Sequence, residues 1–157
     1  MISIQPSFRN ASPTQLATAL QDARNYTLAL FDHFEAAGLD QPARVPYLSI
    51  LNPPLWELGH IAWFAEWFVL REASSSDPAA AKYPCMLAAG DRWFDSNNVA
   101  HATRWSLNLP DAAVIKNYVN EILNRVLDKL ATRSNDPATL YPCPRRRADR
   151  GWRHSRR

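Results

Sequence analysis

NPPLWELGHIAWFAEWFVLR, residues 52–71, predicts a helix at the centre of the fold. Asn52 followed by Pro53 is typical of a helix start, because asparagine can accept from the free N–H groups of the first turn and proline loses no hydrogen bond there. Apolar side chains cover most of the circumference of the predicted helix. We therefore expect it to be the most buried helix of the domain, ending at about Arg71.

Another helix is predicted upstream, over about residues 13–37. Ser12 is expected to cap it, with Pro13 in the first helical position and Gln15 completing a capping box. Gly38 supplies a C-terminal stop. The helical period is carried by Leu16, Leu20, Ala23, Thr27, Leu30, Phe31 and Phe34.

Downstream, the sequence predicts a loop, a crossover and a third helix. Residues 73–81 are rich in serine and contain proline, which is typical of a loop. Residues 82–110 have no sustained period but contain Trp93, Phe94 and Trp105, which indicates a long ordered crossover packed on the bundle. Asp111 then opens an amphipathic helix that reaches about Arg133.

A fourth helix is expected to close the open face of three amphipathic helices, but none is predicted after Pro137. Pro142 and Pro144 block a helical start. We therefore expect a helical bundle over residues 1–141 and a basic, disordered tail over residues 142–157. The tail is rich in arginine, proline, alanine and glycine, which are the residues that a GC-rich coding sequence tends to encode when it is translated in the wrong reading frame. The tail therefore resembles the product of a frameshift.

Charge is divided unevenly along the chain. Residues 144–157 hold seven arginines and one aspartate, a balance of 7 − 1 = +6, and the other residues have 11 − 14 = −3. Hydrophobic residues make up 46% and charged residues 21%, as in soluble globular proteins. Neither a signal peptide nor a membrane-spanning helix is predicted. Cys85 and Cys143 are expected to be free structural thiols in a reducing cytoplasm.

His60 is the first candidate for chemistry, because it lies in the middle of the predicted central helix. Trp56, Trp63 and Phe64 share its face at three- and four-residue spacing. A polar ring in that setting needs a partner. From the residues alone two interpretations stay open: a satisfied core histidine, or a metal ligand or acid/base group whose other partners are distant in sequence.

Two segments resemble a known family. Residues 52–67 resemble the second helix of the DinB-like domain in ergothioneine-forming sulfoxide synthases, nearest to the selenoneine synthase branch. Residues 93–105, WFDSNNVAHATRW, are similar to the crossover that precedes that family's third helix. The resemblance covers about residues 14–141. It implies an all-α, DinB-like up-down helical bundle with a long crossover, its fourth helix missing or replaced by the basic tail.

The resemblance also implies a reaction. The family uses a non-haem Fe(II) and O₂ to join sulfur or selenium, from a thiol or selenol donor, to the imidazole ring of hercynine. His60 would be the first of three histidine ligands to the iron. Arg104 would bind the donor's carboxylate through its fork of N–H groups, the alternative being an exposed or structurally paired arginine. No catalytic residue is assigned, His33 has no role, and His101 is a weaker candidate.

The chain departs from the family after Tyr141. There the family's fourth helix carries a His-x-x-x-His-x-Glu motif with the other two ligands, whereas residues 144–157 contain only His154. The family's second, sulfatase-modifying-factor-like domain is also missing. We therefore expect a truncated domain that by itself binds no iron, is inactive and self-associates through its open face.

Two other functions stay open at this stage. The chain could be a non-catalytic binding module whose arginine-rich tail engages nucleic acid or an acidic partner in a salt-dependent manner, although nucleic acid is the less favoured partner. It could also be a DinB-like thiol-dependent transferase with a different metal, which again needs three ligands.

Overall fold

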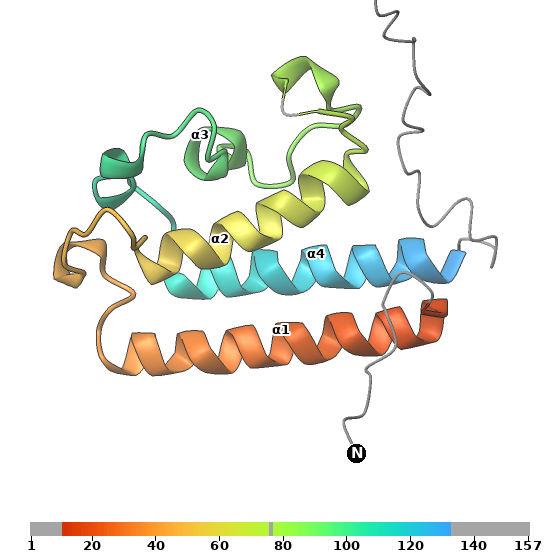
Figure 1. The fold of residues 1–157 in the computed structure, drawn as a ribbon, viewed down its shortest axis with the longest axis horizontal. Coiled ribbons are helices and arrows are strands. Elements are labelled where there is room, and N and C mark those ends of the chain that lie inside the picture. Colours follow the sequence, from red (N-terminus) through yellow and green to blue (C-terminus); the bar gives the residue numbers. More distant parts are fainter. Residues whose placement is uncertain (1–10, 76, 133–157) are drawn as a thin grey trace, which may run out of the picture.

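A computed structural model describes residues 11–75 and 77–132, and its regular elements there are all helical (Figure 1). Three long helices pack on one another: α1 (Pro13–Ala36), α2 (Pro54–Ala65) and α4 (Ala112–Thr132). The shorter elements are η2 (Pro42–Arg44), the π-helical turn η3 (Glu66–Leu70), η4 (Pro78–Ala80), α3 (Gly90–Phe94) and η5 (His101–Trp105). The all-α class predicted from the sequence is confirmed.

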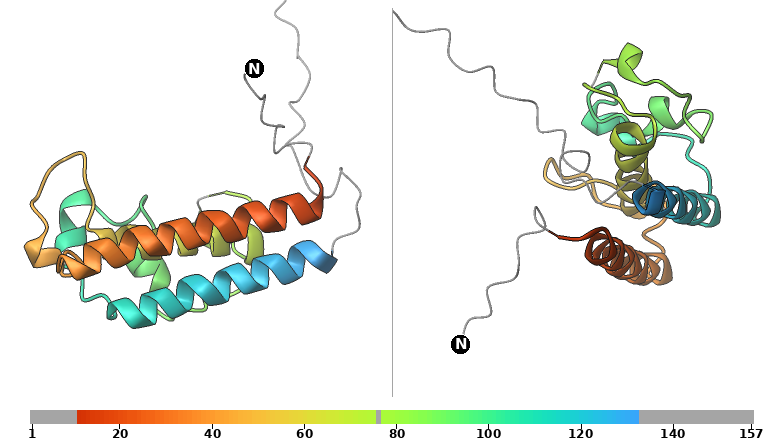
Figure 2. Two further views of the ribbon diagram at one scale, coloured as in Figure 1. Left: turned by 90° about the horizontal axis from the view of Figure 1, so that it is seen from below. Right: turned by 90° about the vertical axis from the view of Figure 1, so that its right-hand side faces the viewer.

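The long helices follow an up-down path with one long return. In Figure 1, α1 runs antiparallel to α2, whereas α4 runs in the same direction as α2 because the crossover brings the chain back before α4 begins. Figures 1 and 2 show the crossover on the side of α2 that faces away from α1. Helix α2 therefore lies between α1 and the crossover, and it packs against α4 as well.

Helix α1 begins and ends where its sequence predicts. The Ser12 hydroxyl accepts from the backbone N–H of Gln15, and the Gln15 side chain accepts from the backbone N–H of Ser12 at 2.8 Å. At the other end, Gly38 has a φ of 72°, and its N–H donates to the carbonyl of Glu35. A left-handed residue after the last turn is the usual helix stop.

The start of α2 differs from the prediction. Pro53 is the N-cap residue and Asn52 makes no capping bond. The Asn52 amide instead donates to the Glu57 carboxylate, and its oxygen accepts from Arg104 Nη1 at 2.7 Å. The prediction that Asn52 caps the helix is therefore wrong, because its side chain links α2 to the crossover.

Helix α2 is the most buried of the long helices, as predicted, and η3 continues it to Leu70. One side nevertheless stays open. Ile61 and Phe64 are about half exposed, at 48% and 52%, and Leu30 of α1 is 47% exposed. An open face on the three-helix bundle was predicted, without particular side chains being assigned to it. The residues after 132, which include the expected basic tail, lie outside the described part of the chain.

The crossover is ordered and packed, as predicted, but it contains the short helices α3 and η5, which the sequence did not indicate. Elements of five residues are too short to show a helical period. Phe94, the last residue of α3, is completely buried. It lies so close to Gly59 that a Cβ atom built on Gly59 would be 2.3 Å from the Phe94 ring.

This contact gives a first prediction. Gly59→Ala should lower the free energy of unfolding by about 1–3 kcal/mol, the usual cost of overpacking a core. At a helical position where the new methyl group met no neighbour, replacing glycine by alanine would instead raise the free energy of unfolding by about 1 kcal/mol. Urea unfolding followed by circular dichroism measures the difference.

The matched control is the same substitution in a Phe94→Leu background. Leucine lacks the ring atoms that the new methyl group would meet, so Gly59→Ala should there be much less destabilising. An equal loss in the two backgrounds would contradict the proposed collision.

Candidate functional site

A column of aromatic rings runs along one side of α2 and η3. The ring centroids of Trp56 and His60 are 4.8 Å apart with planes 13° from parallel. For His60 and Trp63 the centroid distance is 6.1 Å and the angle between the ring planes is 20°. For Trp63 and Trp67 the corresponding values are 5.3 Å and 27°. Side chains three or four residues apart meet on a helix, so this spacing stacks them. His60 therefore lies inside the column, half-buried.

An arginine lies at each end of the column. The guanidinium carbon of Arg104 is 3.9 Å from the centroid of the Trp56 ring, and that of Arg71 is 4.6 Å from the centroid of the Trp67 ring. Both distances are within the range of cation–π attraction. The sequence does not reveal this arrangement, because Arg104 is 48 residues from Trp56.

Ring N–H groups of the column donate to α3. Trp56 Nε1 donates to the carbonyl of Trp93 at 2.7 Å, and Trp63 Nε1 donates to the Asp91 carboxylate at 2.7 Å. His60 Nδ1 is 2.7 Å from the carbonyl of Phe94. A carbonyl oxygen can only accept, so Nδ1 of His60 carries the hydrogen and Nε2 of the neutral ring carries a lone pair.

The hydrogen bond to Phe94 is compatible with both interpretations of His60 that the sequence left open. One ring nitrogen has a protein partner, as a core histidine requires. Within the described residues no hydrogen bond reaches Nε2. The structure therefore presents an imidazole whose tautomer is fixed on one side and whose other nitrogen is able to accept a proton or bind a metal ion.

Arg104 is paired within the protein. Its Nη1 donates to Asn52 at 2.7 Å and its Nη2 to the carbonyl of Val99 at 3.3 Å, while Nε is buried and has no partner among the described residues. Burial lowers the pKa of Arg104, and the nearby Glu57 carboxylate opposes that shift. The two site residues predicted from the sequence, His60 and Arg104, are thus brought together at the ring of Trp56.

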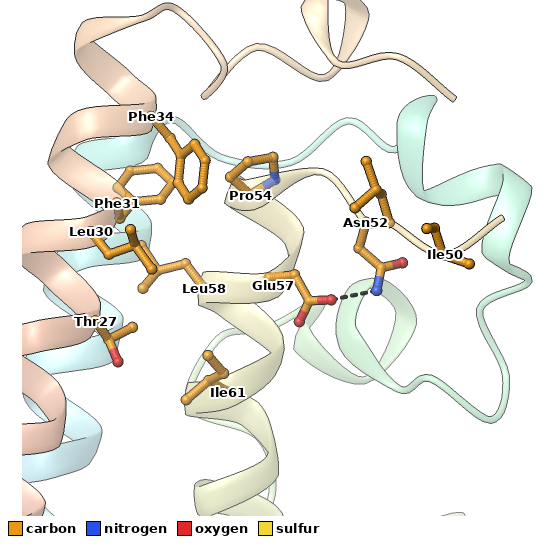
Figure 3. A pocket seen from close by; sticks show the side chains of 11 residues that line it. Thr27, Leu30, Phe31, Phe34, Ile50, Asn52, Pro54, Glu57, Leu58 and Ile61 are labelled. Carbon is orange, nitrogen blue, oxygen red and sulfur yellow. Dashed lines mark hydrogen bonds between the residues drawn. The ribbon is translucent and has the colours of Figure 1, made fainter. Parts of the chain in front are cut away.

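An apolar groove of about 310 Å³ lies between α1 and α2 (Figure 3). Figure 3 shows Glu57 in its wall, hydrogen-bonded to Asn52. Through Asn52, the groove is linked to Arg104. The lining residues are Thr27, Leu30, Phe31, Phe34, Ile50, Leu51, Asn52, Pro54, Glu57, Leu58 and Ile61. His60 is not among them.

A buried carboxylate ties η3 to the rest of the fold. Glu66 is 1% exposed and accepts from the hydroxyl of Tyr118, the backbone N–H of Met86 and the thiol of Cys85. Three donors compensate a charge that would otherwise be costly to bury. Burial and the Glu66 charge raise the pKa of Tyr118. The sequence does not reveal this cluster, because the partners of Glu66 are 19 to 52 residues away along the chain.

Cys85 belongs to this cluster and behaves as a structural thiol, as predicted. Burial, followed by the charge of Glu66, raises its pKa to about 12. Because only the thiolate is nucleophilic, we expect Cys85 to react slowly near neutral pH. Cys143 lies outside the described residues.

His33 and His101, the other histidines in the described part of the chain, lie close to backbone carbonyls. His33 Nδ1 lies 2.6 Å from the carbonyl of Ala29, and His101 Nε2 lies 2.6 Å from that of Leu51. Over residues 11–75 and 77–132, no three His, Cys, Asp or Glu side chains are grouped closely enough to hold a metal ion. His154 lies beyond this range. In the same range no helix is long and apolar enough to span a membrane.

Comparison with known proteins supports one relationship. No family model matches the chain. The hercynine oxygenase of Mycobacterium tuberculosis (strain ATCC 25618 / H37Rv) is 30% identical to it over 125 residues, which are 80% of this chain and 27% of that protein. The chain thus spans about a quarter of the length of this relative. The similarity supports the predicted relation to enzymes that act in the ergothioneine pathway. It does not test the assignment to a DinB-like domain or to the selenoneine synthase branch.

The raised pKa of Cys85 gives a second prediction. Its alkylation by iodoacetamide should be slow at pH 8 and continue to accelerate toward pH 12. Glu66→Gln removes a negative charge that disfavours the thiolate, so it should lower the pKa of Cys85. At pH 9 the thiolate fraction should rise about tenfold for each unit by which the pKa falls, and the alkylation rate should rise by a smaller factor, because a less basic thiolate is a weaker nucleophile.

Peptide mass spectrometry resolves alkylation at Cys85, at temperatures well below the measured Tm of each variant. Glu121→Gln, which removes an exposed carboxylate paired with Arg125, is the control and should leave the rate unchanged. A Cys85 rate that Glu66→Gln does not alter would show that the Glu66 charge has no influence on the thiol.

Proposed function

We propose that this chain is the histidine-bearing helical part of a non-haem iron enzyme that acts on hercynine in ergothioneine or selenoneine formation. The observation that carries the proposal is the bond from His60 Nδ1 to the carbonyl of Phe94, which leaves Nε2 in the form that binds metals. The similarity to a hercynine oxygenase supports the substrate.

His60 fits one position of an iron site. Imidazole suits iron, and histidines that bind metals commonly donate their other N–H to a carbonyl or carboxylate. A single imidazole is not enough for tight binding, and the described residues bring no group of three ligands together. On this proposal the described residues supply one ligand, and the other two would belong to a helix with the His-x-x-x-His-x-Glu motif that the resemblance implies. Iron, when bound, would supply the activation of O₂ for C–S or C–Se bond formation.

The residues of this chain would orient and shield that site. Trp56 and Trp63 stack near the two sides of the His60 ring, so the ring's plane is set before a metal arrives. Arg104 is the proposed contact for the carboxylate of the thiol or selenol donor. Its Nη1 is already bonded to Asn52, so a carboxylate would have to replace that bond, which a charged acceptor favours over a neutral amide oxygen.

A chimera tests the proposal. The 125 matched residues of the Mycobacterium tuberculosis hercynine oxygenase would be replaced by those of this chain. We expect the chimera to take up iron and to consume hercynine in an O₂-dependent reaction. His60→Ala should lower its iron affinity by more than about a hundredfold, since loss of a hydrogen-bonding partner behind a ligand alone costs roughly ten- to a hundredfold.

His33→Ala is the matched control. Like His60, His33 has its Nδ1 close to a backbone carbonyl, in this case one of its own helix, but it lies outside the aromatic column. Iron content measured by mass spectrometry and hercynine consumption measured by chromatography should be unaffected by it. A chimera that keeps its iron and its activity with His60→Ala would rule out His60 as a ligand. A folded, iron-loaded chimera that leaves hercynine unchanged would rule out the substrate.

A further inference from the structure

The Trp56 ring is stacked on the His60 ring. A histidine on a helix can turn about its last side-chain bond, which would move Nδ1 off the carbonyl of Phe94 and redirect Nε2. The Trp56 ring, 4.8 Å away and nearly parallel, restricts that rotation because a turned imidazole would meet the indole face. The hydrogen bond fixes which nitrogen carries the proton, and the stacked ring fixes the plane.

Trp56 is itself held on several sides. It is 1% exposed, its Nε1 donates to the carbonyl of Trp93, and the Arg104 guanidinium lies over its ring. Because of these contacts, the indole plane has little freedom to move with the imidazole. A rigid neighbour of this kind restrains a ring more firmly than a flexible aliphatic side chain does.

The two rings are anchored as a pair. Trp56 and His60 donate to the consecutive carbonyls of Trp93 and Phe94, at the C-terminal end of α3. Carbonyls in the last turn of a helix have no partner within the helix and accept from other groups. The close contact of Gly59 with Phe94 sets the distance between α2 and α3 at this point.

We propose that Trp56 is a positioning residue, which holds the His60 ring so that Nδ1 stays on the carbonyl of Phe94 and Nε2 faces away from it. A role of this ring orientation in metal binding rests on the proposed function. The orientation itself is a property of the metal-free chain and can be measured without metal.

The test uses ¹⁵N-labelled chain without metal at pH 8, where imidazoles are ordinarily neutral. Long-range ¹H–¹⁵N spectra report the tautomer of each histidine, and the Nδ1–H signal of His60 reports its bond to Phe94. In Trp56→Leu we expect that signal to disappear and the nitrogen shifts to move toward a mixture of tautomers. Retention of the wild-type signal and shifts in Trp56→Leu would overturn the proposal.

Trp105→Leu is the matched control. Trp105 also donates its Nε1 to a backbone carbonyl, that of Val45 at 3.0 Å, and also contacts a histidine, His101, at 5.2 Å between ring centroids. Its loss should leave the signals of His60 unchanged. An equal disturbance of His60 by both substitutions would show general loosening of the fold and would also overturn the proposal.

Trp56→Phe decides the matter if Trp56→Leu fails to fold. Phenylalanine keeps an aromatic ring but cannot donate to Trp93, so the pair is less firmly anchored. We expect the Nδ1–H of His60 to exchange with water about tenfold faster than in the wild type and in Trp105→Phe. An unchanged exchange rate would contradict the positioning role. Neither result depends on iron, so this test and the chimera can fail independently.

Discussion

The hydrogen bonds from the rings of α2 to the end of α3 are the interaction on which the rest of the structure depends. Two consecutive carbonyls accept from Trp56 and His60, and Gly59 allows Phe94 to approach closely enough for both bonds to form. The crossover therefore has a fixed position on α2. Because the site residue His60 is one of the two donors, the same contact that orders the crossover also selects the tautomer of the histidine.

A second attachment holds the crossover at the other end of α2. Buried Glu66 binds Met86 and Cys85 of the crossover together with Tyr118 of α4, and Arg71 pairs with Asp91 of α3. Each of these buried charges has compensating partners, which offset the cost of removing it from water. With attachments at both ends, a segment without a regular sequence period is able to form a defined wall beside the aromatic column.

The sequence predicts what local rules determine. The capping box at Ser12, the stop at Gly38 and the amphipathic stripe of α4 all depend on residues within one or two turns, and the structure confirms them. His60 was located as a candidate because its neighbours at helical spacing are aromatic. Contacts between distant residues were not predictable: His60 and Phe94 are 34 residues apart. Asn52 was misassigned for the same reason, since its partner Arg104 is distant in sequence.

We propose that α3 fixes His60 so that Nε2 is the metal-binding atom. A crystal structure of the chimera with Co(II), with the metal located by anomalous scattering, would show which ring nitrogen binds the metal. We expect a metal ion bonded to Nε2 of His60, with Nδ1 still within hydrogen-bond distance of the carbonyl of Phe94. A metal ion bonded to Nδ1, or held by other side chains while His60 stays uncoordinated, would contradict it.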